Sequence, residues 1–217
     1  SAFGVGAALA LTTTGLPLNA NGGRVGGAFA WFNAGAVIGG LAVVGFSLIH
    51  AAAFLALKTD GDVRVSARRF MAVAAPIALL PLVAGVIAVQ VHGGTVLTWS
   101  LVAFAAAAAI YAWFANRVGR EGRAFLSLGL FLVTGAAAIF IACYPVVLPS
   151  TIDHAFDLTI SNASSSNYTL GVMTVVACFG LPLVLAYQGW TYWVFRKRIS
   201  GSHIPEARPV RPAVRQP

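Results

Sequence analysis

Histidine is the side chain in this sequence best suited to hold a haem iron or to carry a proton, and one of the four histidines lies inside a long apolar segment. This is His50, about two helical turns before the end of the segment 31–57. An imidazole there could ligate haem, carry a proton, or be a buried ring hydrogen-bonded to a neighbouring helix. No second ligand stands at helical spacing, so we expect the third role. We expect His92, His154 and His203 to be solvated, at a span boundary or in loops.

The remaining side chains that could do chemistry form no recognisable constellation. Cys143 and Cys178 both lie in apolar segments, where a free thiol behaves as a small hydrophobic side chain. The sequence contains no CxxC, HExxH, P-loop or GxSxG pattern. The long apolar segments also contain no carboxylate that could relay protons. We therefore expect no catalytic residue and no metal ligand here, and no cofactor-binding residue can be singled out.

The elements that would position these residues are long apolar segments without Asp, Glu, Lys or Arg. There are five of them: 31–57, 70–91, 97–115, 124–148 and 168–195. A helix needs roughly 20 apolar residues to cross the hydrocarbon layer of a membrane, and each segment is about that long or longer. The first apolar stretch, 2–11, is too short to cross and is expected to be the end of a further helix. The sequence therefore predicts an all-α, polytopic transmembrane bundle with about five complete spans.

The charges alternate along the chain in a way that predicts its orientation. Thirteen of the fourteen basic residues lie in the gap 58–69, in the gap 116–123, or after residue 195. Basic residues gather on the cytoplasmic side of membrane proteins, so these segments and the C-terminus are expected there. The formal net charge of +8 is accordingly attributed to orientation and to contact with anionic lipid headgroups rather than to nucleic-acid binding.

Small and special residues predict how the spans pack. Gly35 and Gly39, four residues apart, would let two helix backbones approach closely. Pro76 and Pro81 predict a kink in the segment 70–91, which membrane helices tolerate where neighbours satisfy the freed carbonyl groups. Polar side chains near the span ends should be satisfied by snorkelling or by hydrogen bonds between helices; these are Gln90, Asn116 and Gln188.

The last span and the residues after it have their own signals. The helix 168–195 is expected to be capped by one of the preceding polar residues, which are Ser165, Ser166 and Asn167. The rich Pro and Arg content after residue 199 predicts a disordered cytoplasmic tail. We therefore divide the chain into a transmembrane bundle at 1–199 and a tail at 200–217. The bundle is expected to be the C-terminal part of a longer subunit.

Four separated segments resemble a known family in the same order along the chain. They are the GLPLNANG loop at 15–22, the helix at 33–59 with its GG pair and ALKT end, the loop at 144–165 with YP, PST and NASS, and the last helix at 169–193 with TLxxMT and YxxWxYW. These motifs resemble subunit II of cytochrome bd quinol oxidases, and the wording of 187–196 is most similar to actinobacterial members. Asn19 and Asn21 depart from the resemblance, because the family has acids there.

The resemblance implies a function for the complex and a supporting role for this chain. Such oxidases take electrons from a membrane quinol, here menaquinol for an actinobacterial type, and reduce dioxygen to water in the bacterial plasma membrane. Two b-type haems and one d-type haem are held by subunit I, where the quinol also docks. The resemblance implies that subunit II is pseudo-symmetric, with this chain as half of it, and that it ligates no haem and supports subunit I. A structural quinone or lipid, and a small accessory subunit, are further partners to expect. The alternative is a small apolar membrane transporter or channel subunit.

Overall fold

The computed structural model describes residues 1–195, so the predicted tail at 200–217 lies outside the described residues and the division of the chain there stays a prediction. The described chain is mostly helical and has almost no sheet, which confirms the all-α fold class. Its long helices are α1 (Ala2–Thr14), α2 (Ala34–Lys58), α3 (Gly61–Ala78), α4 (Leu80–Gly93), α5 (Val96–Arg117), α6 (Glu121–Cys143) and α8 (Asn167–Val194). Five segments are long and apolar enough to cross a membrane, with α3 and α4 forming one of them.

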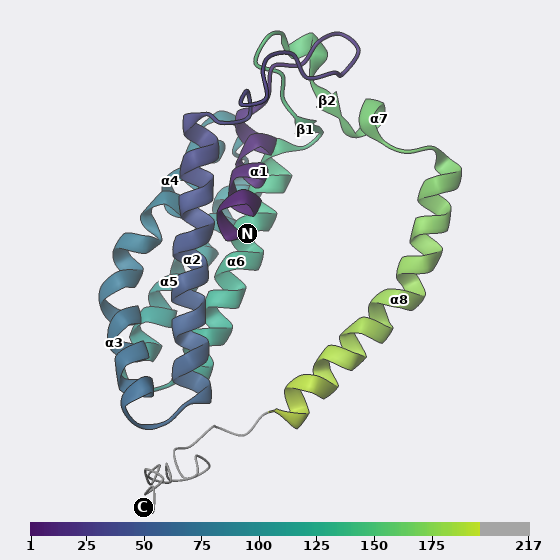
Figure 1. Cartoon of the computed structure of the whole chain (residues 1–217). Coiled ribbons are helices and arrows are strands. Elements are labelled where there is room, and N and C mark those ends of the chain that lie inside the picture. Colours follow the sequence, from purple (N-terminus) through teal and green to yellow (C-terminus); the bar gives the residue numbers. More distant parts are fainter. Residues whose placement is uncertain (196–217) are drawn as a thin grey trace, which may run out of the picture.

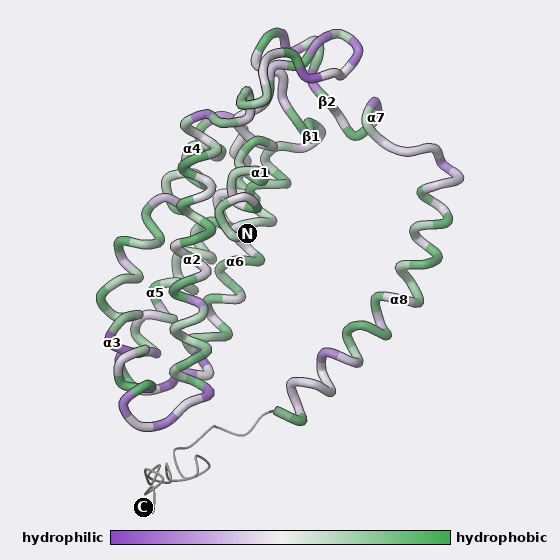
Figure 2. The backbone as a smooth tube through the Cα atoms, in the orientation of Figure 1, coloured by the Kyte–Doolittle hydropathy of each residue, from purple (hydrophilic) through white to green (hydrophobic). Residues whose placement is uncertain are grey.

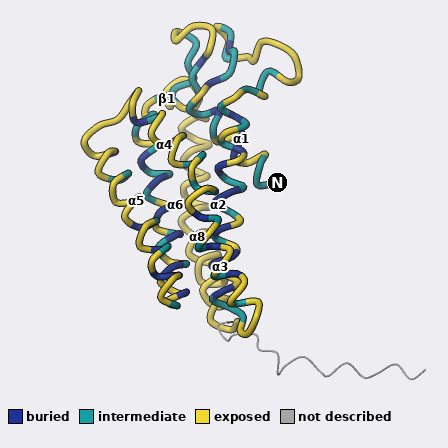
Figure 3. Tube along the Cα trace, turned by 90° about the vertical axis from the view of Figure 1, so that its left-hand side faces the viewer, coloured by how far each residue is buried: buried dark blue, intermediate teal, exposed yellow. Residues whose placement is uncertain are grey.

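Helices α1 to α6 pack side by side as a bundle, and α8 stands apart from it along the same direction (Figure 1). The centre of the bundle is filled by side chains of α2, α3, α5 and α6, chiefly Phe46, Ile49, Met71, Leu128 and Phe131 with a set of buried alanines. Outward-facing residues along the helices are exposed (Figure 3) and yet apolar (Figure 2), as a lipid-facing surface requires. The chain is thus an integral membrane protein.

Helix α2 begins at Ala34, three residues after the start of the apolar segment 31–57. The side-chain oxygen of Asn33 accepts a hydrogen bond from the Ala36 amide at 2.8 Å, which caps the free amides of the first turn. Trp31 and Phe32 therefore belong to the preceding turn rather than to the span. Hydropathy shows which residues can lie in lipid, whereas the capping hydrogen bond determines the residue at which the helix begins.

Helix α3 begins at Gly61, well before the apolar segment 70–91, and carries Arg64, Arg68 and Arg69 on its first turns. The charged residues end the apolar pattern but not the backbone hydrogen bonding. Two of these arginines bind groups on α5 and α6, as described below, so the charged turns are held against the bundle. The gap 58–69 is consequently mostly helix, joined to α2 by a short turn at residues 59 and 60.

The predicted kink lies at Leu79, between Pro76 and Pro81, where α3 ends and α4 begins. Pro76 has no amide hydrogen, so it cannot bond to the carbonyl of Ala72 four residues earlier. The indole nitrogen of Trp113 on α5 donates to that carbonyl instead, at 3.0 Å. A neighbouring helix thereby satisfies the group that the proline frees.

Close approach of α2 to its neighbours depends on its glycines. A Cβ on Gly39 would overlap Ala10 and the Gly6 carbonyl of α1, and one on Gly35 would overlap Thr14. The pair four residues apart thus packs α2 against α1, in agreement with the sequence. Farther along, a Cβ on Gly45 would overlap the Ala78 carbonyl at the α3–α4 break. One helix therefore uses glycine against two different neighbours.

The segment 124–148 is not one helix to its end, because α6 stops at Cys143. Pro145 disfavours helical backbone at the residue before it and lacks a donor itself. The chain then forms strand β1 (Val146–Leu148), which pairs antiparallel with β2 (Leu158–Thr159). A 3₁₀ turn (His154–Phe156) and the short α7 (Ile160–Ala163) complete this loop layer. Ser166 then caps α8 by accepting from the Thr169 amide, which is one of the three predicted caps.

Candidate functional site

Polar side chains with interhelical contacts concentrate at the end of the bundle formed by the α2–α3 and α5–α6 turns. The hydrophilic colour at these turns, and in the loop layer at the opposite end, is visible in Figure 2. The ammonium of Lys58 also reaches the end of α8, where it donates to the Phe195 carbonyl at 2.8 Å. The basic gaps 58–69 and 116–123 and the end of α8 therefore lie at one end of the molecule, as the alternating charges predicted. We call this the basic end.

An acid that sequence reasoning passed over, Glu121, lies at the centre of the basic end. Its side chain is 4% exposed, and Oε1 accepts from Nε and Nη2 of Arg64 at 2.9 and 2.7 Å. Arg68 approaches the same oxygen at 3.7 Å. Two cations offset the cost of burying one carboxylate. The sequence signal was available: Glu121 is the acid in the gap 116–123 and stands in the first turn of a helix, where a negative charge is favourable.

Arg68 also closes the C-terminal end of α5. Its guanidinium donates to the Asn116 carbonyl at 3.2 and 3.0 Å and to the Arg117 carbonyl at 3.1 Å. In return, the Asn116 side-chain amide donates to the Arg68 carbonyl at 2.9 Å. The last carbonyl groups of a helix lack partners within the helix, and a cation there is favourable. The expected interhelical bond of Asn116 is thus present, and it ties α5 to α3.

His50 lies among aromatic rings rather than opposite a polar partner. Its ring centroid is 5.3 Å from that of Phe46 and 4.4 Å from that of Phe125 on α6. Among residues 1–195, Nδ1 is buried and has no hydrogen-bond partner. The expected hydrogen bond to a neighbouring helix is therefore wrong, because α6 presents a phenyl ring where an acceptor was expected. His92 and His154 are exposed, as expected, and His203 lies outside the described residues.

Of the two other polar residues expected near span ends, Gln90 is buried and Gln188 is exposed. Gln90 on α4 is 2% exposed, and its amide nitrogen donates to the Ala138 carbonyl of α6 at 3.2 Å. This is the kind of interhelical hydrogen bond predicted for it. Gln188 is exposed on α8. Cys143 is half-buried and Cys178 is exposed, and neither forms a disulfide.

The loop at 15–22 has an asparagine, Asn19, where the family that the chain resembles has an acid. The side-chain oxygen of Asn19 accepts from the amides of Asn21 and Gly23 at 3.0 and 2.8 Å, which closes the turn. A carboxylate would accept the same two bonds. This loop is joined to the loop between α6 and α8, because the Ser150 hydroxyl donates to the Leu18 carbonyl at 3.2 Å. Asn19 is therefore structural in this chain.

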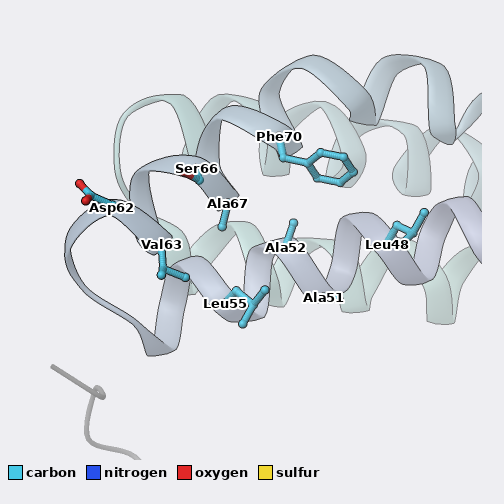
Figure 4. Close-up of a pocket in the computed structure, with 9 residues that line it drawn as sticks. All are labelled: Leu48, Ala51, Ala52, Leu55, Asp62, Val63, Ser66, Ala67 and Phe70. Carbon is cyan, nitrogen blue, oxygen red and sulfur yellow. The ribbon is translucent and has the colours of Figure 1, made fainter. Parts of the chain in front are cut away.

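A groove of about 540 Å³ lies between α2 and α3 near the basic end (Figure 4). Its walls are mostly apolar, with Leu48, Leu55 and Phe70 along its length and Asp62 with Ser66 at one end. This arrangement suits a hydrocarbon chain. Across residues 1–195, no three His, Cys, Asp or Glu side chains lie close enough to hold a metal ion.

Comparison with known proteins places the chain in a family. The family model described as cytochrome bd terminal oxidase subunit II matches residues 1–195. Cytochrome bd ubiquinol oxidase subunit 2 of Bacillus subtilis (strain 168) is 32% identical over an alignment of 179 residues, and the match covers 78% of this chain and 52% of that protein. Cytochrome bd-I ubiquinol oxidase subunit 2 of Escherichia coli (strain K12) is 32% identical over 110 residues, 51% of this chain and 29% of that protein.

The chain thus spans about half the length of the Bacillus relative and less than a third of the Escherichia one. The match over all described residues includes each of the segments that carried the resemblance, from the first loop to α8. The packing agrees with this, since those segments form the α1–α2 contact, the two loops joined by Ser150, and the last span. The chain belongs to the cytochrome bd terminal oxidase subunit II family.

Proposed function

We propose that this chain is the C-terminal part of subunit II of a bd-type quinol:oxygen oxidoreductase in an aerobic respiratory chain, where it supports subunit I without ligating haem. The match to the subunit II family over residues 1–195 carries the proposal. As the resemblance implies, subunit I holds two haems b and one haem d and receives electrons from a quinol, menaquinol in an actinobacterial type. A small accessory subunit is a further partner.

The physical contribution of this chain is a dry wall beside the haems. Alanine and glycine at the centre of the bundle allow close helix contacts, which is the packing that a water-excluding wall needs. Excluding water from a redox site suppresses proton leakage and side reactions. The groove between α2 and α3 is our candidate place for a structural quinone or lipid, because its walls suit an isoprenoid or acyl chain.

Purification of the full-length subunit with an affinity tag in mild detergent tests the proposal. We expect a haem-bearing partner to copurify in constant ratio, with the absorption bands of b- and d-type haems. The matched control is the same tag on an unrelated membrane protein from the same cells. A colourless preparation that carries out transport by itself would overturn the proposal.

We further propose that the basic end and the C-terminus face the cytoplasm of a bacterial plasma membrane. The support is the gathering of the basic gaps at one end of the structure together with the bias of basic residues toward the cytoplasm. Cysteines placed beside Arg68 and Arg120 should be inaccessible to an impermeant maleimide in intact cells, and one in the loop 19–23 should react. Labelling of the first two from outside would contradict this orientation.

The alternative of a small transporter or channel rests on the broken span at Leu79. Discontinuous helices in transporters expose polar backbone groups to substrate at mid-membrane. Here two carbonyl groups near the break are covered, that of Ala72 by the indole of Trp113 and that of Ala78 by the backbone of Gly45. The break is therefore a packed kink, which favours the supporting role.

A further inference from the structure

A second groove, of about 260 Å³, lies between α3 and α5 at the basic end. It is on a different face of α3 from the apolar groove that α3 forms with α2. Its lining combines three cations with two small or apolar residues and one amide; the residues are Val65, Arg68, Arg69, Ala72, Asn116 and Arg117. Three guanidinium groups thus surround one depression at the level where a span leaves the membrane.

Two of the three cations are available to an anion. Arg68 is engaged with the end of α5, as described above. Arg117 is exposed, and its guanidinium carbon lies 3.8 Å from the ring centroid of Trp113, which leaves its outer face open. Arg69 is exposed as well, and within residues 1–195 no salt bridge joins it or Arg117 to an acid. The acid nearest in sequence to Arg69 is Asp62, which lines the other groove, and the acid nearest to Arg117 is Glu121, which accepts from Arg64.

Below the cations the seam between α3 and α5 becomes apolar. Residues three or four apart share a helix face, so Pro76 continues the face of α3 that carries Arg69 and Ala72. On α5, Ile110 continues the face of Arg117 and Trp113 in the same way. Pro76 is exposed and Ile110 is 59% exposed. A molecule with its anionic group at the rim would therefore find a hydrocarbon-compatible path directly beneath.

We propose that the α3–α5 groove binds one anionic phospholipid, with its phosphate between Arg69 and Arg117 and an acyl chain along Ala72, Pro76 and Ile110. Charge complementarity selects an anionic headgroup over a choline headgroup, whose ammonium would be repelled by the same guanidiniums. The membrane supplies this occupant at high local concentration. The inference rests on the chain spanning a membrane and holds whatever reaction the complex performs.

Native mass spectrometry of the purified full-length complex, after exchange into phosphatidylglycerol or phosphatidylcholine, tests the site. The test variant is R69Q/R117Q, with R69Q alone as a milder version that leaves the Trp113 contact intact. The matched control is R120Q/R123Q, which removes the same charge from exposed positions at the same end but outside the groove. Each lost cation at a membrane surface lowers affinity about fivefold.

We expect one phosphatidylglycerol molecule to remain bound to the parent and to R120Q/R123Q. Its affinity should fall about fivefold in R69Q and further in the double variant. Phosphatidylcholine should not replace it, and inorganic phosphate at millimolar concentration should not displace it, because it lacks the acyl chain. Equal losses in both double variants, equal retention of phosphatidylcholine, or displacement by inorganic phosphate would each overturn the proposal.

Discussion

Helices α6 and α8 are both long and apolar, yet α6 lies within the bundle and α8 has no buried residue. Gln90 of α4 and Arg64 of α3 both bind backbone or side-chain groups of α6. In contrast, at the end of α8 the backbone carbonyl of Phe195 accepts a hydrogen bond from Lys58 of the bundle. Apolar composition decides that a helix lies in lipid, whereas polar contacts and close backbone approach decide which neighbour it packs against.

The largest expected difference in stability between variants of α6 and α8 comes from replacing one leucine by alanine in each helix. Leu128 of α6 is 1% exposed and Leu183 of α8 is 72% exposed. Leu128→Ala should destabilise the chain by about 2–5 kcal/mol, because it leaves a cavity among packed side chains. Leu183→Ala should change stability by less than about 0.5 kcal/mol. Unfolding of the 217-residue chain by SDS in mixed micelles measures both. Equal losses would mean that α8 packs as tightly as α6.

Removing the buried acid should have the next largest effect. Glu121→Gln keeps the size of the side chain and leaves Arg64 facing a neutral amide, so we expect a loss of about 2 kcal/mol. A buried pair broken on one side costs about 3–5 kcal/mol, and the partial exposure of Arg64 reduces that figure. Asp62→Asn, at an exposed acid in the first turn of α3, is the control and should have little effect. The same unfolding assay would contradict the role of Glu121 if both variants behaved alike.

A third comparison is between a glycine that contacts a neighbouring helix and a glycine with open space around it. Gly45→Ala on α2 would place a methyl group into the Ala78 carbonyl, and overpacking of this kind costs about 1–3 kcal/mol. Gly180→Ala on α8 meets nothing within 4 Å and should be neutral or stabilising by up to about 1 kcal/mol. The fraction of each variant that stays folded after heating in detergent shows whether the substitution stabilises or destabilises the chain. A loss at Gly180 would show that α8 needs its glycine for a close neighbour.

The smallest effect is expected at the link between α8 and the bundle. Lys58→Met keeps the aliphatic length of the side chain and removes the donor to Phe195, so the loss should be about 0.5–1.5 kcal/mol. Proteolysis at residues 164–166, before α8, should become only slightly faster. Arg123→Met is the control at the same end. A loss as large as that of Leu128→Ala would mean that this one contact holds α8 in place.

Much of the architecture followed from the sequence because hydropathy and charge act over whole segments. The spans, the kink between Pro76 and Pro81 and the shared location of the basic gaps were all predicted. Helix bounds differed where a local contact overrides hydropathy, as with the Asn33 cap and Pro145. The Glu121–Arg64 pair joins residues 57 positions apart, so no local pattern could announce it. Nor could a sequence show that Phe125 faces His50.

The covered carbonyls beside Leu79 have a mechanical consequence. A proline-flanked interruption ordinarily serves as a hinge, since fewer backbone bonds resist bending. Bending at Leu79 would break the hydrogen bond from the Trp113 indole to the Ala72 carbonyl in α3. It would also open a void between Ala78 and Gly45. An unmet donor or acceptor is expensive in hydrocarbon. We therefore expect the angle between α3 and α4 to be fixed, so that the two helices move together with their neighbours as one rigid unit.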